Sequence, residues 1–195
     1  MSQPFENNPT EETLDIKITV LGNTLVGKSA LTYRYISNKF PEDHDTTIED
    51  QYKVKNTIEG YQCQIEILDT AGQDDYQSML DTWISFGEGF VLVYSIDQKE
   101  SFDVLKDRYE RIKRNKDEDK VPVIIVGNKC DLEDKRKVMK EEAQNYAKSE
   151  KILFMEASAL KDINVKEVFT AVAAEIVKKR KKIKDTKGDK CCNVF

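Results

Sequence analysis

The segment Gly22–Ser29 is the strongest constraint on how this chain can fold. It reads Gly-Asn-Thr-Leu-Val-Gly-Lys-Ser and matches G-x-x-x-x-G-K-[ST], the phosphate-binding loop. Its two glycines permit a tight wrap in which successive backbone N–H groups face a polyphosphate. The apolar, alternating run Leu14–Leu21 predicts a strand before the loop, and a helical pattern over 28–38 follows it, so that a helix N-terminus adds donors. The sequence therefore predicts a strand–loop–helix unit that binds phosphate. The alternative is a glycine-rich turn without a ligand.

Size and composition indicate one soluble globular domain. The chain has 195 residues, 39% hydrophobic and 34% charged, which is enough for a full core. No apolar run is long enough to span a bilayer, and residues 1–12 lack the apolar core of a signal peptide. Four cysteines without a disulfide-like spacing fit a reducing compartment. We therefore expect a protein of the cytosolic side.

Charge is distributed unevenly along the chain. The net charge is −5, but residues 178–190 contain eight Lys or Arg and two Asp, a charge of +6 that leaves −11 on the rest. A body this acidic argues against general nucleic-acid binding. The basic segment is a separate feature with its own partner.

Strand and helix patterns alternate after the first residues. Beyond the first strand, we expect strands at Tyr52–Ile58, Gln62–Leu68, Gly89–Ile96, Val121–Val126 and Ile152–Glu156. Helical patterns cover about 99–115, 138–149 and 162–183. The first two of these strands form a hairpin around Glu59-Gly60. Such alternation predicts a six-stranded, mostly parallel α/β sheet with helices on both faces. We expect a disordered arm at 1–12, one domain at 13–183 and a flexible basic tail at 184–195.

Two further motifs follow predicted strands, at the sheet edge where ligands bind. Asp69 ends the strand 62–68, the arrangement that holds Mg²⁺ directly or through water beside a phosphate loop. It is followed by Thr-Ala-Gly-Gln; Gly72 can bring its N–H near a γ-phosphate, and Gln73 can orient an attacking water. Alone, an Asp at a strand end is a weak signal.

The second motif, Asn128-Lys129-Cys130-Asp131, follows the strand 121–126. A carboxylate at 131 can accept hydrogen bonds from both donors on the N1–N2 edge of guanine, which adenine lacks, so it would discriminate between the bases. The aliphatic stem of Lys129 can cover a face of the base and Phe40 an edge. Backbone amides of the segment 156–159 can meet guanine O6. The alternative for this motif is a surface turn.

In this order and spacing, the motifs resemble those of the Ras superfamily of small GTPases, over residues 14–180 and at the C-terminus. The segment 44–52, His-Asp-Thr-Thr-Ile-Glu-Asp-Gln-Tyr, is similar to the effector loop of the Ras branch, in which T-I-E-D is distinctive. The resemblance implies a three-layer P-loop NTPase fold (a G domain), GTP and GDP as substrate and product, and Mg²⁺ as cofactor.

The resemblance also implies roles for individual residues. Gln73, Lys28 and Thr47 would act in catalysis, and Ser29 and Thr47 would ligate Mg²⁺, with Asp69 contributing through water. The effector loop would comprise Asp45, Thr46, Thr47, Ile48, Glu49 and Asp50. The residues that would contact the nucleotide are Gly22, Asn23, Thr24, Leu25, Val26, Gly27, Lys28, Ser29, Ala30, Phe40, Thr47, Asp69, Gly72, Asn128, Lys129, Asp131, Ser158, Ala159 and Leu160.

The chain departs from the Ras pattern in five places. Thr24 and Leu25 stand where Ras members have small residues, mostly glycines. Thr24 would then crowd Gln73 and an inserted arginine finger, which contributes about 10³–10⁵ in rate, a magnitude that comes from Ras and related GTPases themselves. The alternative is a backbone shift that accommodates Thr24. His44, the single histidine, replaces a tyrosine, Thr46 a proline, and Leu160 a lysine.

The segment Cys192-Asn193-Val194-Phe195 fits C-a-a-X, and a final Phe favours geranylgeranyl. The basic run before it supplies the second signal that a single lipid chain needs. Cys191 is a candidate for palmitoylation. We therefore expect lipid anchoring at the cytoplasmic face of the plasma membrane. The alternatives for the basic run are a nuclear-import signal or a solvated helix end.

The sequence thus predicts a Ras-like GTPase that switches between GTP and GDP states in signal transduction. Its expected partners are an exchange factor, an activating protein, effectors and an anionic membrane. One alternative is a GTP-dependent binding module with impaired hydrolysis, because of Thr24 and Leu25. Another is a P-loop nucleoside or nucleotide kinase, although neither an acceptor site nor an arginine-bearing lid is evident.

Overall fold

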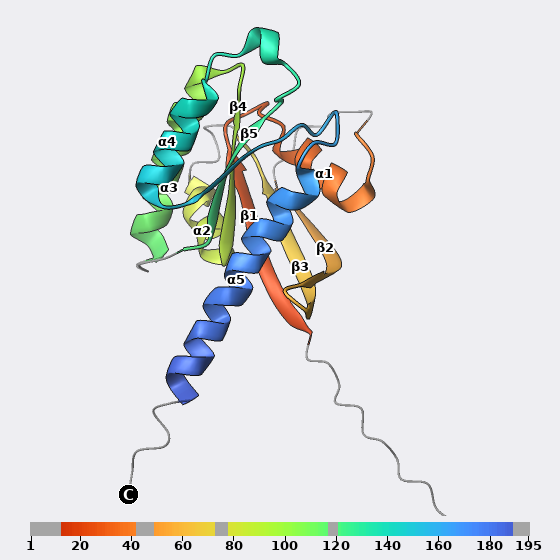
Figure 1. Ribbon diagram of the computed structural model, residues 1–195, viewed down its shortest axis with the longest axis vertical. Helices are drawn as coiled ribbons and strands as arrows, with labels where there is room; N and C mark the ends of the chain where they lie inside the picture. Colours follow the sequence, from red (N-terminus) through yellow and green to blue (C-terminus); the bar gives the residue numbers. More distant parts are fainter. Residues whose placement is uncertain (1–12, 42–48, 73–77, 117–120, 189–195) are drawn as a thin grey trace, which may run out of the picture.

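The computed structural model describes residues 13–41, 49–72, 78–116 and 121–188 (Figure 1). Its strands are β1 (Leu14–Gly22), β2 (Glu49–Ile58), β3 (Tyr61–Thr70), β4 (Gly89–Ser95), β5 (Val123–Asn128) and β6 (Leu153–Glu156). Its helices are α1 (Lys28–Ser37), α2 (Leu80–Phe86), α3 (Lys99–Lys116), α4 (Lys140–Glu150) and α5 (Val165–Gly188), with a short 3₁₀ helix, η2 (Glu133–Lys135). The six strands form one sheet in the order β2-β3-β1-β4-β5-β6.

The sheet is parallel except for its first hairpin. β2 and β3 pair antiparallel around Glu59 and Gly60, whose φ angles of 51° and 82° are those of the tight hairpin turn that suits strand twist. All other neighbouring strands run parallel. The predicted α/β architecture is therefore confirmed.

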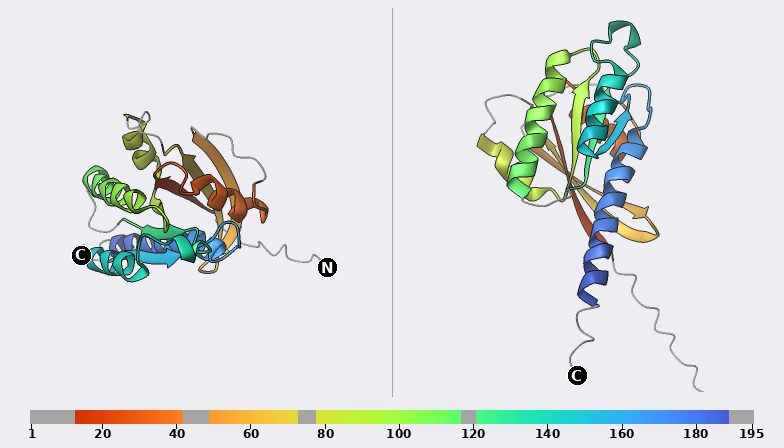
Figure 2. Two further views of the ribbon diagram at one scale, coloured as in Figure 1. Left: turned by 90° about the horizontal axis from the view of Figure 1, so that it is seen from above. Right: turned by 60° about the vertical axis from the view of Figure 1, so that its left-hand side comes forward.

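Helices cover both faces of the sheet (Figure 2). On one face, Ile16, Ile18 and Val20 of β1 share a buried cluster with side chains of α1 and α5, such as Leu31 and Phe169. On the other face, Leu21 and apolar residues of β4 pack with α2, α3 and α4 in a second cluster. Because β4 and β5 are buried on both sides, their runs are continuously apolar, as central parallel strands require.

The register places the motif-bearing strand ends at one edge. Val20 of β1 pairs with Asp69 of β3, and Ser95 of β4 pairs with Asn128 of β5. In such a sheet, the carboxyl ends of the strands meet on the side where loops can converge on a ligand.

Three elements differ from the sequence prediction. β2 begins at Glu49 rather than at 52, because pairing with β3 outweighs the low strand propensity of Glu49-Asp50; both residues therefore lie in a strand, not in a loop. α2 has only seven residues, too few for a periodic signal. α5 continues to Gly188, because a helix that is already formed adds residues at little cost, so 184–188, predicted as flexible tail, is helical.

Among the described residues, no helix has the length and apolarity to cross a bilayer.

Candidate functional site

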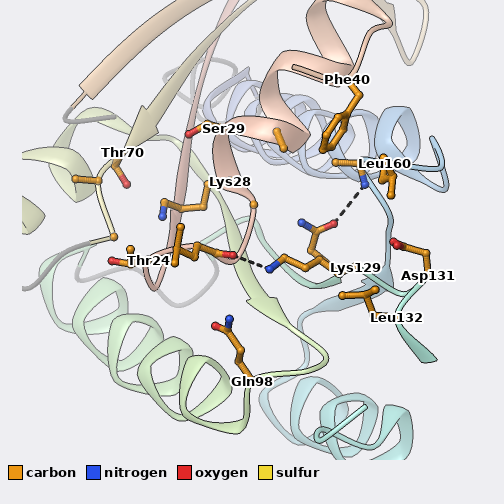
Figure 3. A pocket seen from close by; sticks show the side chains of 17 residues that line it. Thr24, Lys28, Ser29, Phe40, Thr70, Gln98, Lys129, Asp131, Leu132 and Leu160 are labelled. Atoms are coloured by element: carbon orange, nitrogen blue, oxygen red, sulfur yellow. Dashed lines mark hydrogen bonds between the residues drawn. The ribbon is translucent and has the colours of Figure 1, made fainter. Parts of the chain in front are cut away.

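A cavity of about 640 Å³ opens at the carboxyl edge of the sheet (Figure 3). This volume is in the range of small-molecule sites. Of the predicted nucleotide-contacting residues, those that line it are Thr24, Leu25, Gly27, Lys28, Ser29, Ala30, Phe40, Gly72, Asn128, Lys129, Asp131, Ala159 and Leu160. The structure thus brings together three motifs that lie far apart in the chain, with Leu25 and Lys129 separated by 104 positions.

The loop between β1 and α1 has the left-handed backbone that its glycine spacing suggests. Gly27 precedes α1 with a φ of 92°, and Leu25 has a φ of 61°. The Nζ of Lys28 is turned back into the loop and donates to the Asn23 carbonyl at 2.9 Å. A Cβ on Gly72 would lie 2.4 Å from the backbone nitrogen of Thr24. The chain after β3 therefore rests directly on this loop.

Two ionisable groups at the floor of the cavity have perturbed pKa values. Burial lowers the pKa of Lys28 to about 8, against the opposing attraction of Asp69. Burial raises the pKa of Asp69 to about 6, against the Ser29 hydroxyl and Lys28, which both favour its charged form. Neither Asp69 oxygen has a hydrogen bond of good geometry to a described residue. A buried carboxylate in this condition is costly unless something else satisfies it.

The residues after β5 hold the phosphate loop from the other side. Asn128 Nδ2 donates to the Val26 carbonyl at 2.8 Å, and Lys129 Nζ donates to the Leu25 carbonyl at 2.8 Å. A Cβ on Gly27 would lie 2.4 Å from Asn128 Nδ2, so a glycine is needed there for close approach as well as for its φ.

The segment after β6 closes the opposite end of the cavity. Ser158 Oγ donates to Asp131 Oδ1 at 2.5 Å, and the Ala159 N–H points to Asn128 Oδ1 at 3.4 Å. Phe40 and Leu160 lie near each other at the rim (Figure 3). The second oxygen of Asp131 and the rim side chains are thus placed around a space that a planar base can enter.

The remaining predicted residues fall into two groups. The structure places Gly22, Asn23, Val26, Asp69 and Ser158 beside or beneath the lining residues rather than in the wall itself. Outside the described residues lie Gln73, Asp45, Thr46, Thr47, Ile48, Cys191 and Cys192. The functional roles of these residues, and of the predicted residues that line the cavity, stay predictions.

Four lining residues were not predicted: Thr70, Ala71, Gln98 and Leu132. Each of the four follows either a strand that ends at this edge of the sheet or a residue of one of the motifs. Their positions in the chain could therefore have identified them as lining residues. Leu25, although it contributes to the lining, is 77% exposed.

Similarity to known proteins extends over most of the chain. Residues 17–178 match the family model described as Ras family. The chain is also 46% identical over 176 residues to Ras-like protein rasB of Dictyostelium discoideum, an alignment that covers 90% of this chain and 89% of that relative.

Proposed function

Since the chain belongs to the Ras family of small GTPases, we propose that it is a switch in signal transduction at a membrane. As a family member it is a GTP hydrolase. What supports the switch most directly is that a single cavity is lined by the phosphate loop, by Gly72 and by the residues Asn128, Lys129 and Asp131.

The loop Gly22–Ser29 would hold the phosphates. Lys28 is the only lysine of this loop, and its Nζ would exchange the Asn23 carbonyl for phosphate oxygens. Because burial lowers the pKa of Lys28 to about 8, a bound polyphosphate would favour the ammonium form and recover part of the desolvation cost. The N-terminus of α1 would add backbone donors.

The residues at the floor of the cavity fit a hydrated Mg²⁺. Within the described ranges no cluster of three His, Cys, Asp or Glu could hold a metal alone, but the buried oxygens of Asp69 lack good protein partners and lie beside Ser29. Such a set suits a cation that keeps waters and takes phosphate oxygens as ligands. Ser29 and Thr47 would bind it directly and Asp69 through water. When bound, Mg²⁺ would neutralise charge that develops on the β- and γ-phosphates.

Asp131 would select guanine. Ser158 occupies one of its oxygens and orients the carboxylate, while the other can accept from the N1–N2 edge of the base. Ala159 and Leu160 would meet O6 through the backbone, and Lys129 would cover one face. An adenine nucleotide would leave a carboxylate without partners.

Hydrolysis would proceed by in-line attack of water on the γ-phosphate. Gln73 would orient the water, and Lys28 would stabilise the charge that develops. Thr47 and Gly72 would hold two switch segments while the γ-phosphate is present and release them after it leaves. Effectors would read the segment around Ile48, Glu49 and Asp50, with the β2 edge as a surface for strand addition.

We also propose that the basic segment 178–190 and a lipid on Cys192 hold the protein at the cytoplasmic face of the plasma membrane. Intact-mass analysis of protein from its native cell tests this: a geranylgeranyl adduct is expected, and an unmodified Cys192 would contradict it.

Nucleotide exchange on purified protein tests the switch. Protein stripped of nucleotide and returned to Mg²⁺ should bind GDP and GTP tightly and ATP poorly, and single-turnover hydrolysis should yield GDP. The variant Lys28→Met should lose binding, whereas Lys106→Met, in α3 and outside the cavity lining, should not. Failure of the natural protein to bind GDP, or a preference for ATP, would refute the proposed function.

A further inference from the structure

Arg34 joins two segments on either side of the cavity end where the base is expected. It lies in the last turn of α1. Its Nε donates to the Ala159 carbonyl at 2.8 Å and one Nη to the Leu160 carbonyl at 3.0 Å, while the other Nη donates to the Asn38 carbonyl at 3.0 Å. One planar guanidinium therefore bonds to three backbone carbonyls from two distant parts of the chain.

The first of these segments, residues 157–160, forms the base end of the cavity. Ala159 and Leu160 both line the cavity, yet neither belongs to a helix or strand. Leu160 is 50% exposed, so apolar burial contributes little to its position. The bridge between Ser158 and Ile163 fixes the start of the turn, and Ala159 is buried in the core cluster. Arg34 holds the two carbonyls at the tip, those of Ala159 and Leu160.

The second segment leads from α1 to Phe40 at the rim. Asn38 ends α1 in a left-handed conformation, with a φ of 57°, and its N–H bonds to the Arg34 carbonyl at 2.9 Å. The Arg34 side chain then bonds to the carbonyl of the same Asn38. Two residues later, Phe40 lines the cavity near Leu160 (Figure 3). Arg34 therefore orders both the approach to Phe40 and the tip that carries Leu160.

We propose that Arg34 is a positioning residue that slows the release of guanine nucleotide. This role rests on the proposed function, because it requires that a guanine base occupy the space between Phe40 and residues 159–160. With Arg34 in place, the amides of the tip are held ready for O6 at no further ordering cost when nucleotide binds. Without it, the tip opens more often and the base leaves sooner.

The shape of the guanidinium distinguishes the positioning role from a second possible role, in which Arg34 only places a positive charge at the C-terminal end of α1. A cation in the last turn of α1 is favoured by the helix dipole, and Lys would serve as well as Arg. Parallel bonds to two adjacent carbonyls require the rigid fork of Arg, which the point charge of Lys does not supply. Arg34→Lys therefore removes the positioning role and keeps the charge.

Dissociation of a fluorescent GDP in Mg²⁺ buffer tests the proposal. The variants Arg34→Lys and Arg34→Gln should each release the fluorescent GDP roughly tenfold faster than the natural protein. A factor of this size corresponds to the free energy of about one charge-assisted hydrogen bond. The matched control Arg114→Gln, an exposed arginine of α3, should leave the rate unchanged. If Arg34→Lys releases GDP at the natural rate, the positioning role is refuted.

Two further measurements test whether faster release of GDP comes from the backbone amides at residues 159–160. The same variants should accelerate release of 6-thio-GDP much less, because its sulfur accepts hydrogen bonds weakly and the tip amides contribute less from the start. Hydrogen exchange in the GDP complex should be faster at residues 159–161 in Arg34→Lys than in the natural protein. Equal acceleration for both nucleotides, or unchanged exchange, would refute the proposal. If the natural protein itself fails to bind GDP, the proposed function falls instead.

Discussion

Asp69 gives the sharpest prediction, because its burial penalises the nucleotide-free protein. Its side chain is fully buried, and its pKa rises from 3.8 to about 6. At 1.36 kcal/mol per pH unit, holding this carboxylate ionised costs about 3 kcal/mol near neutral pH. Since the native pKa is the higher one, the native state holds the proton more tightly. The contribution of the group to stability is thus full below about pH 4 and is lost as pH rises through 6.

The variant Asp69→Asn cannot titrate, so comparing it with the natural protein isolates this effect. Between pH 5 and pH 7, the free energy of unfolding of the natural, nucleotide-free protein should fall relative to the variant by about 1.3 kcal/mol. Urea unfolding in EDTA at both pH values measures the difference. With saturating GDP and Mg²⁺ the pH dependence should disappear, because the proposed cation would favour the ionised form at both pH values.

Asp81→Asn is the matched control. Hydrogen bonds from Arg111 hold the pKa of Asp81 below its ordinary value, so its titration lies below pH 5 and the difference from the natural protein should not change between pH 5 and pH 7. If Asp69→Asn and the natural protein show the same pH dependence in EDTA, the buried carboxylate is not strained and the reasoning fails.

Three other predictions concern single side chains. Asp131→Asn should weaken GDP binding by about 10² or more in equilibrium titration, since an amide lacks the negative charge that strengthens hydrogen bonds from the guanine edge; unchanged affinity would count against the base assignment. At Leu25, whose φ is 61°, the Gly variant should melt about 2–4 °C above the Ala variant in the GDP complex, because only glycine occupies this conformation freely; a lower melting temperature for Gly would contradict this. Trp83, the only tryptophan, donates to Glu49 Oε2 at 2.6 Å, so Glu49→Gln should shift its fluorescence emission, whereas Glu66→Gln should not.

The central sheet and the position of the site could be predicted from the sequence because their signals are local. The run Leu14–Leu21 leads straight into a loop with two fixed glycines, and β4 and β5 are apolar except for their last residues, Ser95 and Asn128, because both of their faces are covered. Once parallel strands are expected, the motifs after β1, β3 and β5 must share an edge. The cavity at that edge follows from topology rather than from any single residue.

What the sequence did not reveal depends on contacts between distant segments. The start of β2 at Glu49 is dictated by its partner strand, and α2 is too short to show a period, its Trp83 being fixed by the second core cluster. Arg34 reads as an ordinary residue of a polar helix face. Its bonds to residues 159 and 160 cross more than a hundred positions of the chain, and no local pattern signals them.

The length of α5 has a mechanical consequence. The helix spans 24 residues, to Gly188, and extends well past the sheet against which its first half packs (Figure 1). At 1.5 Å per residue, the ten residues beyond Lys178 form a rod of about 15 Å. A rigid helix couples the orientation of its distal end to that of the domain, whereas a flexible chain would not. Any surface that grips its distal end would therefore also set the tilt of the nucleotide cavity, and with it the direction from which other proteins can approach.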